Sequence, residues 1–277
     1  MILVTGATGN VGRNLVSYLL EAGHPVRALT RDPERAALPD GVEVVQGDLE
    51  QPDTLAAALK GVTGAFLFPV HGRLAGFLGS AVAAGVQHVV LLSSASVTDE
   101  YLSKERMGQL NAADEQEVAA SGLDWTFVRP GPFMVNDLPW AWGIRAEGVV
   151  RAAYGAAVTA PVDERDIAAV AAHALTDPRH RNKAYELTGP QGLSQIERVR
   201  ILGQVLGREL VFDELTVAEA RERMTRYLPG ETADSLLRMY ARQSGATVPV
   251  QPTVQEVTGR PAHTYAEWAV HHLEDFR

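Results

Sequence analysis

The fold is decided by residues 2–12, which read Ile2-Leu3-Val4-Thr5-Gly6-Ala7-Thr8-Gly9-Asn10-Val11-Gly12. The apolar run predicts a buried strand, the spaced glycines predict a tight turn, and the amphipathic run that follows predicts a helix. Gly6 allows a backbone turn that a Cβ would obstruct, Gly9 lets the main chain approach a pyrophosphate, and Gly12 lets the helix lie close to the sheet. Free N–H groups at the helix start then face the anion. The stretch therefore predicts a dinucleotide site lined by Gly6, Ala7, Thr8, Gly9, Asn10 and Val11; the alternative is a purely structural glycine turn.

The composition argues against several classes of protein. The chain has 277 residues, of which 46% are hydrophobic and 21% charged, as in an ordinary globular enzyme. A net charge of −9 without a run of Lys or Arg disfavours nucleic-acid binding. No segment approaches the ~18–20 apolar residues that span a bilayer, no signal peptide is visible, and the absence of cysteine excludes thiolate chemistry. We therefore expect a cytoplasmic, metal-independent protein that binds neither nucleic acid nor membrane.

Predicted strands and helices alternate after the opening stretch. Strands are expected at residues 25–30, 42–46, 65–68, 88–93 and 125–129, and helices at 52–60, 74–84 and 104–120. A short helix is expected to begin at Asp32-Pro33, with the proline in its tolerated first-turn position. Six strand–helix alternations with short connections predict an α/β fold with a doubly wound, parallel Rossmann sheet.

The alternation weakens after Pro130-Gly131-Pro132, and an aromatic patch, Pro139-Trp140-Ala141-Trp142, lies outside any clear strand. A helix at 162–175, short strands at 184–187 and 209–212, and capping boxes at Ser194, Thr216 and Thr264 are expected further on. We assign residues 1–132 to a Rossmann domain with later returns near 157–189. Residues 133–156 and 190–277 are assigned to a smaller, mostly helical C-terminal substrate lobe. Because ligands of open α/β sheets bind beyond the carboxyl ends of the strands, this lobe is expected to cover the reactive end of the cofactor.

The end of the second strand favours NADP(H) over NAD(H). A protein that selects NAD usually carries Asp or Glu there, to hold the ribose hydroxyls. This chain has Thr30 and Arg31 instead, and a planar guanidinium suits a phosphate. The alternative is a solvated Arg31 that pairs with Asp32 or Glu34. Asp48, just beyond the third strand, is placed either to accept from an adenine amino group or to cap a helix.

Several motifs follow one another in order along nearly the whole chain. They are Gly6-Ala7-Thr8-Gly9-Asn10-Val11-Gly12, Arg31-Asp32-Pro33, Gly47-Asp48-Leu49, Ser93-Ser94-Ala95, Ser121-Gly122-Leu123-Asp124-Trp125, Arg129-Pro130-Gly131, Tyr185-Glu186-Leu187-Thr188-Gly189 and Thr264-x-x-Glu267-Trp268. Together they resemble the NmrA-like family of atypical short-chain dehydrogenase/reductases. The resemblance implies a Rossmann domain that binds NADP(H) and a small substrate lobe. By position it also implies that the cofactor is bordered by Phe68, Pro69, Ser93 and Pro130-Gly131. Asp48 and Leu49, just beyond the third strand, are further candidates for cofactor binding.

The usual proton-transfer pair of short-chain dehydrogenases is missing. Those enzymes use Tyr-x-x-x-Lys on one helix face, and counting back from Ser121-Gly122 places Met107 and Asn111 at the two positions. The weak catalytic candidates are Ser93, Ser94, Tyr101 and Lys104. The serines are as well suited to bonding backbone or ribose, and an unrelated surface pair is the simpler interpretation of Tyr101 and Lys104. His71 follows the fourth strand, from where it could face the nicotinamide, but a loop histidine without a role is the simpler interpretation.

A reductase is the favoured interpretation. A quinone-like or activated carbonyl acceptor yields a delocalised anion that water can protonate, so a small, electron-poor, largely apolar acceptor needs no Tyr/Lys pair. Its pocket is expected to be lined by Phe133, Met134, Trp140 and Trp142, for which core packing or a subunit contact are alternatives. The family also includes non-catalytic proteins that sense NADP(H) and bind a regulatory protein. A regulatory partner, a homo-oligomer and nicotinamide-assisted isomerisation or epimerisation therefore stay open.

Overall fold

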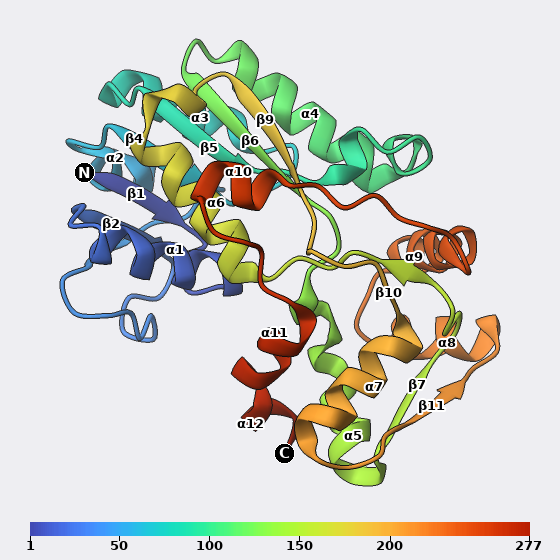
Figure 1. Ribbon diagram of the computed structural model, residues 1–277. Coiled ribbons are helices and arrows are strands. Elements are labelled where there is room, and N and C mark those ends of the chain that lie inside the picture. Colours follow the sequence, from blue (N-terminus) through green and yellow to red (C-terminus); the bar gives the residue numbers. More distant parts are fainter. The chain divides into compact units, whose positions relative to one another are not determined.

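The computed structural model describes all residues, 1–277, and divides into two compact units. The first unit comprises Met1–Pro130, Glu164–Leu187 and Thr253–Arg260; the second comprises Gly131–Asp163, Thr188–Pro252 and Pro261–Arg277. The chain therefore returns to the first unit twice. In Figure 1 these returns are the yellow helix α6 with strand β9 and the red helix α10. No helix combines the length and the hydropathy that crossing a bilayer requires.

The first unit is built on one sheet of seven strands, all parallel. In chain order they are β1 (Ile2–Thr5), β2 (Val26–Thr30), β3 (Glu43–Gln46), β4 (Gly64–Leu67), β5 (His88–Leu92), β6 (Asp124–Pro130) and β9 (Lys183–Leu187). Their order in the sheet is β3-β2-β1-β4-β5-β6-β9. The direction of strand order therefore reverses between β1 and β4, which puts the topological switch point at the carboxyl end of β1. The predicted Rossmann fold is confirmed.

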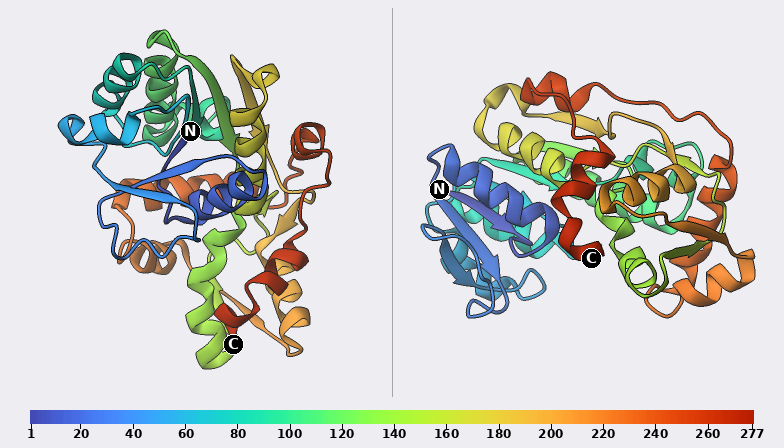
Figure 2. Two further views of the ribbon diagram at one scale, coloured as in Figure 1. Left: turned by 90° about the vertical axis from the view of Figure 1, so that its left-hand side faces the viewer. Right: turned by 60° about the horizontal axis from the view of Figure 1, so that its bottom comes forward.

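Helices cover both faces of this sheet (Figures 1 and 2). Helices α1 (Asn10–Glu21) and α6 (Glu164–Thr176) pack against each other on one face, and α10 (Thr253–Thr258) packs on α6. The other face carries α2 (Leu55–Leu59), α3 (Leu74–Ala84) and α4 (Arg106–Ala120). Because both faces are covered, every residue of β1, β4 and β5 is buried, as their continuous apolar runs predict.

One predicted element of the first unit is wrong. No helix begins at Asp32-Pro33; the Asp32 carboxylate accepts from the Arg35 N–H at 3.3 Å and closes a single turn. The turn does not propagate, because Ala37 adopts a left-handed conformation (φ 44°) that a helix cannot contain. The longer helices hold: α3 has its predicted bounds, and α4 begins two residues late, after a 3₁₀ turn at Leu102–Lys104.

The second unit is mostly helical and has two short sheets. Its helices are a 3₁₀ helix (Met134–Trp140), α5 (Ala141–Glu147), α7 (Gln195–Leu206), α8 (Val217–Met224), α9 (Gly230–Gln243), α11 (Tyr265–His271) and α12 (Leu273–Phe276). Its strands are β7 (Val149–Ala152), β8 (Val158–Thr159), β10 (Leu193–Ser194) and β11 (Val211–Glu214). β11 lies two residues beyond the predicted strand and pairs in parallel with β7, which the sequence analysis missed. All three predicted capping boxes are present and begin α7, α8 and α11.

A buried ion pair lies in the core of the second unit. Arg198 of α7 contacts both carboxylate oxygens of Asp137, at 2.8 and 2.7 Å, and the Tyr265 hydroxyl donates to the same carboxylate at 2.7 Å. The Arg198 guanidinium also stacks over the Trp140 ring, 5.1 Å from its centroid. Burial raises the pKa of Asp137, and Arg198 opposes this shift by stabilising the carboxylate. The pair therefore joins the 3₁₀ helix, α7 and α11 through one desolvated charge contact.

Substituting Arg198→Met should lower the free energy of unfolding by about 3–5 kcal/mol, because it leaves a buried carboxylate without its cation. Urea denaturation measures the loss. Arg226→Met is the matched control: Arg226 pairs with Glu222 on the surface, and removing such a pair costs about 0–1 kcal/mol. Equal losses for the two variants would contradict the importance given to the buried pair.

Candidate functional site

The turn between β1 and α1 is closed by backbone contacts alone. Gly6 has a left-handed conformation (φ 61°), and its carbonyl accepts from the Gly9 N–H at 3.0 Å. A Cβ on Gly12 would lie 2.2 Å from that same carbonyl oxygen, so only glycine fits there. Gly9 is the N-cap of α1, and no side chain caps the helix. The N–H groups of its first turn are therefore available to an anion, which fits a dinucleotide pyrophosphate.

Phe68 and Pro69 follow β4 directly and lie beside this turn. The Phe68 N–H donates to the Thr5 hydroxyl at 2.8 Å, which ties the end of β4 to the end of β1. A Cβ on Gly6 would lie 3.0 Å from the Phe68 Cβ, so the Phe68 side chain packs on the turn while 51% of Phe68 stays exposed. The structure thus brings together Gly6 and Phe68, which the sequence analysis proposed for one site.

Arg31 and Asp48 follow the next two strands at the same edge of the sheet. Arg31 follows β2, the neighbour of β1, and is exposed. Asp48 follows β3, and its carboxylate accepts from the Glu50 N–H at 3.0 Å, so it also stabilises a local turn. Leu49 is half-buried and packs on the core of the first unit. Arg31 is thus an exposed cation directly after the last residue of β2.

Ser93, at the end of β5, is held by a buried charge pair. Its hydroxyl donates to Glu115 of α4 at 2.5 Å, and Arg129 of β6 donates to both oxygens of Glu115 at 2.8 and 2.6 Å. These hydrogen bonds to Glu115 raise the pKa of Arg129. Because the Ser93 hydrogen points to Glu115, its oxygen is left to accept from a ligand. Ser94 accepts from the Ser96 N–H at 3.1 Å and caps a 3₁₀ helix, Ala95–Val97.

The positions expected for the Tyr/Lys pair carry no acid. Met107 lies in the first turn of α4, and the Asn111 side-chain amide donates to the Met107 carbonyl at 2.8 Å. Tyr101 and Lys104 lie before α4, on the 3₁₀ turn, where the Lys104 ammonium is 5.9 Å from the Tyr101 ring centroid. Both residues are exposed, so the structure brings them together as a surface pair outside the helix.

The structure adds a histidine–aspartate pair that the sequence analysis did not recognise. The Nδ1 atom of His71, in the loop after β4, lies 2.5 Å from a carboxylate oxygen of Asp114 on α4. The sequence placed a histidine after the fourth strand, but its partner is 43 residues away, and no motif connects them. The signal that would have found Asp114 is its position one residue before Glu115, on the buried side of α4.

The four residues predicted to line a substrate pocket lie in the second unit. Met134 is fully buried in its core, and Phe133 and Trp140 pack against the same cluster. Trp142 lies on α5 with 64% of its surface exposed. Met134 is thus buried, Phe133 and Trp140 are partly exposed, and Trp142 is the most exposed of the four.

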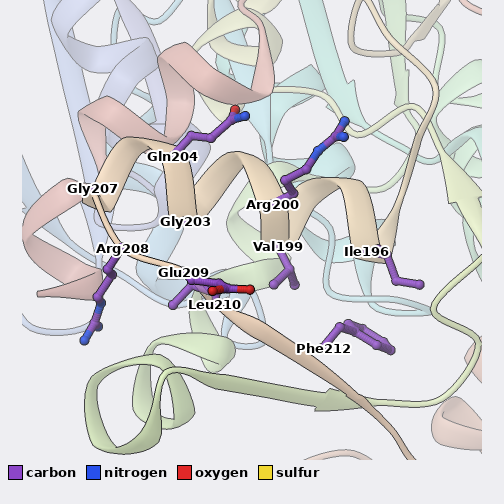
Figure 3. Close-up of a pocket in the computed structure, with 10 residues that line it drawn as sticks. All are labelled: Ile196, Val199, Arg200, Gly203, Gln204, Gly207, Arg208, Glu209, Leu210 and Phe212. Carbon is purple, nitrogen blue, oxygen red and sulfur yellow. The ribbon is translucent and has the colours of Figure 1, made fainter.

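A groove of about 470 Å³ lies between α7 and the segment that leads into β11. Its lining residues are Ile196, Val199, Arg200, Gly203, Gln204, Gly207, Arg208, Glu209, Leu210 and Phe212. Figure 3 shows Val199 pointing from α7 toward Leu210, while Arg200 and Gln204 point away from β11. None of the four predicted substrate-binding residues lines this groove.

Substituting Gly12→Ala should raise the NADPH dissociation constant at least tenfold, about 1.4 kcal/mol, because the new methyl group displaces the turn at Gly6. Titration calorimetry measures the change. Gly79→Ala on α3 is the matched control: a Cβ there meets nothing within 4 Å, and alanine in a helix stabilises by about 0.5–1 kcal/mol. A Gly12→Ala protein that binds NADPH as the control does would contradict the site.

Known proteins resemble this chain over its full length. The NAD(P)H-binding family model matches residues 6–178, more than half of the chain. A (4-alkanoyl-5-oxo-2,5-dihydrofuran-3-yl)methyl phosphate reductase from Streptomyces griseus is 46% identical, covering 100% of this chain and 99% of that protein. An NAD(P)H azoreductase from Xenophilus azovorans is 39% identical, with the same coverage of 100% and 99%.

A solved structure supports the same assignment. An NADPH-dependent quinone oxidoreductase from Escherichia coli, in complex with NADPH, superposes with a TM-score of 0.83 at 26% identity, covering 99% of this chain and 100% of that one. The predictions of the family and of a nicotinamide dinucleotide cofactor are confirmed. The chain belongs to the NAD(P)H-binding family of NmrA-like, atypical short-chain dehydrogenase/reductases, and it is an NAD(P)H-dependent oxidoreductase.

Proposed function

We propose that this protein transfers hydride from NADPH to a small, electron-poor, conjugated acceptor. The observation that carries the proposal is the uncapped glycine turn at the switch point, in a chain whose full-length relatives are reductases. The names of these relatives describe an acyl-substituted unsaturated lactone that carries a methyl phosphate, an azo compound and a quinone. What the three acceptors share is a conjugated π-system that is short of electrons.

The residues around the turn fit the cofactor. We assign the pyrophosphate to the backbone of Gly6–Val11 and the 2′-phosphate of NADP(H) to Arg31. Asp48 and Leu49 border the adenosine end, while Phe68, Pro69 and Ser93 border the other end. When bound, NADPH supplies the hydride. Ser93, whose hydrogen is directed to Glu115, contributes an acceptor for a hydroxyl or amide of the ligand.

The residues of α4 favour an electron-poor acceptor over a simple ketone. A simple ketone becomes a basic alkoxide when it takes up hydride, and it needs a placed acid at once. Met107 and Asn111 supply no such acid from α4. A conjugated acceptor spreads the negative charge over several atoms. Orienting it beside the cofactor therefore contributes more to the rate of its reduction than a placed acid does.

The test is a panel of acceptors with purified protein and NADPH. We expect loss of the reduced cofactor, followed at its absorbance band, with quinones, azo dyes or acyl-substituted unsaturated lactones, and little with simple ketones. Saturated lactones of the same size are the matched control, because they lack the conjugated double bond. Tight NADPH binding without turnover of any acceptor would instead favour a non-catalytic sensor of NADP(H).

Arg31→Ala should raise the dissociation constant of NADPH at least tenfold, about 1.4 kcal/mol, and that of NADH far less. The reason is that only NADPH carries the phosphate to which we assign Arg31. Titration of both cofactors measures the difference, and Arg35→Ala, four residues along the same loop, is the control. Equal losses for NADPH and NADH would refute the assignment of Arg31.

A further inference from the structure

The His71–Asp114 pair is a short, desolvated contact. The two atoms, His71 Nδ1 and Asp114 Oδ2, are 2.5 Å apart, and only 2% of the Asp114 side chain is exposed. The other Asp114 oxygen accepts from the Gly72 N–H at 3.3 Å. Both carboxylate oxygens are therefore engaged by the loop after β4, and the histidine ring is held in one orientation.

This contact determines which ring nitrogen can act on a ligand. A carboxylate accepts hydrogen bonds, so Nδ1 carries the hydrogen that faces Asp114. The remaining nitrogen, Nε2, is then the one that can take up or release a proton. The His71 side chain is 27% exposed, so the ring is accessible from one side.

The pair lies at the edge of the sheet that holds the cofactor site. His71 is three residues past Phe68, whose side chain packs on the Gly6 turn. Its strand, β4, lies between β1 and β5. Asp114 directly precedes Glu115, which holds Ser93 at the end of β5. Asp114 and Glu115 of α4 thus position His71, which follows β4, and Ser93, which follows β5. These two strands are neighbours in the sheet.

We propose that His71 is the proton donor of the reduction and that Asp114 positions it; this inference rests on the proposed function. Hydride from NADPH forms a bond to the electron-poor carbon of a conjugated carbonyl acceptor, and the displaced π electrons form an enolate. The enolate takes the proton from Nε2 of His71, which becomes neutral and is reprotonated by solvent. NADPH is oxidised to NADP⁺, the acceptor is reduced, and one proton is consumed overall. Asp114 holds the ring through its contact with Nδ1, so that Nε2 is the nitrogen that gives up the proton.

The inference predicts that the need for His71 depends on the acceptor. The enolate formed from an unsaturated lactone without an acyl substituent is a far stronger base than the anion of a hydroquinone, which water protonates readily. A placed acid typically contributes about 10²–10⁴-fold to a rate, and this contribution should be larger for the unsaturated lactone than for the quinone.

His71→Asn is the informative variant, because its side-chain amide can still donate to Asp114 where Nδ1 stands, while Nε2 is removed. We expect the ratio of kcat for an unsaturated lactone without an acyl substituent to kcat for benzoquinone to fall about 100-fold or more. The NADPH dissociation constant should stay within about threefold, and added imidazole should restore part of the lactone rate. Asp114→Asn should lower the same ratio without rescue by imidazole.

The control is His24→Asn. His24 precedes β2, at the amino-terminal edge of the sheet, and its variant should keep the wild-type ratio. An unchanged ratio in His71→Asn overturns the inference and leaves the proposed function standing. Equal losses with both acceptors, together with weaker NADPH binding, also overturn it, because they mark a structural role for the loop. A wild-type protein that reduces neither acceptor overturns the proposed function, and the inference with it.

Discussion

The first unit depends on how closely α1 approaches the end of β1. A Cβ at Gly12 would lie 2.2 Å from the Gly6 carbonyl oxygen, which is far inside van der Waals contact. This approach places the uncapped first turn of α1 directly over the carboxyl end of β1, between β2 and β4. The left-handed Gly6 also makes room for Phe68 from the neighbouring strand. One backbone constraint thus shapes the turn to which we assign the dinucleotide and brings the ends of β1 and β4 together there.

Helix α4 provides the second organising element. Its buried residues Asp114 and Glu115 are consecutive, so their side chains point in different directions around the helix axis. They therefore contact residues that follow different strands. Asp114 holds the loop after β4 through His71, while Glu115 holds Ser93 of the β5 end and Arg129 of β6. The helix that carries the Tyr/Lys pair in ordinary short-chain dehydrogenases here orders three strand ends by carboxylates. Its role has moved from supplying an acid to positioning other groups.

The sequence predicted what local patterns encode. Apolar runs gave the parallel strands, spaced glycines gave the turn, and Ser/Thr-x-x-Glu spacing gave three helix starts, because each depends on residues within a few positions of one another. It missed β7, whose four residues pair only with the distant β11. It also missed the His71–Asp114 pair, since a contact across 43 residues depends on how α4 packs on the sheet. The helix at Asp32 failed because a capping residue begins a helix only where the following backbone can continue it.

The buried carboxylates of Asp137, Glu115 and Asp114 differ in the group that each one faces. Asp137 faces Arg198, and Glu115 faces Arg129, both guanidinium groups that keep their charge at every pH at which a protein is folded. Those two pairs can hold elements together, but they cannot exchange a proton with a ligand. Asp114 faces an imidazole, which meets the carboxylate through Nδ1 and has a second ring nitrogen that can exchange a proton with a ligand. A permanent cation could also anchor the loop after β4, whereas the imidazole anchors it through one nitrogen and leaves the other for the proton transfer that we propose for His71.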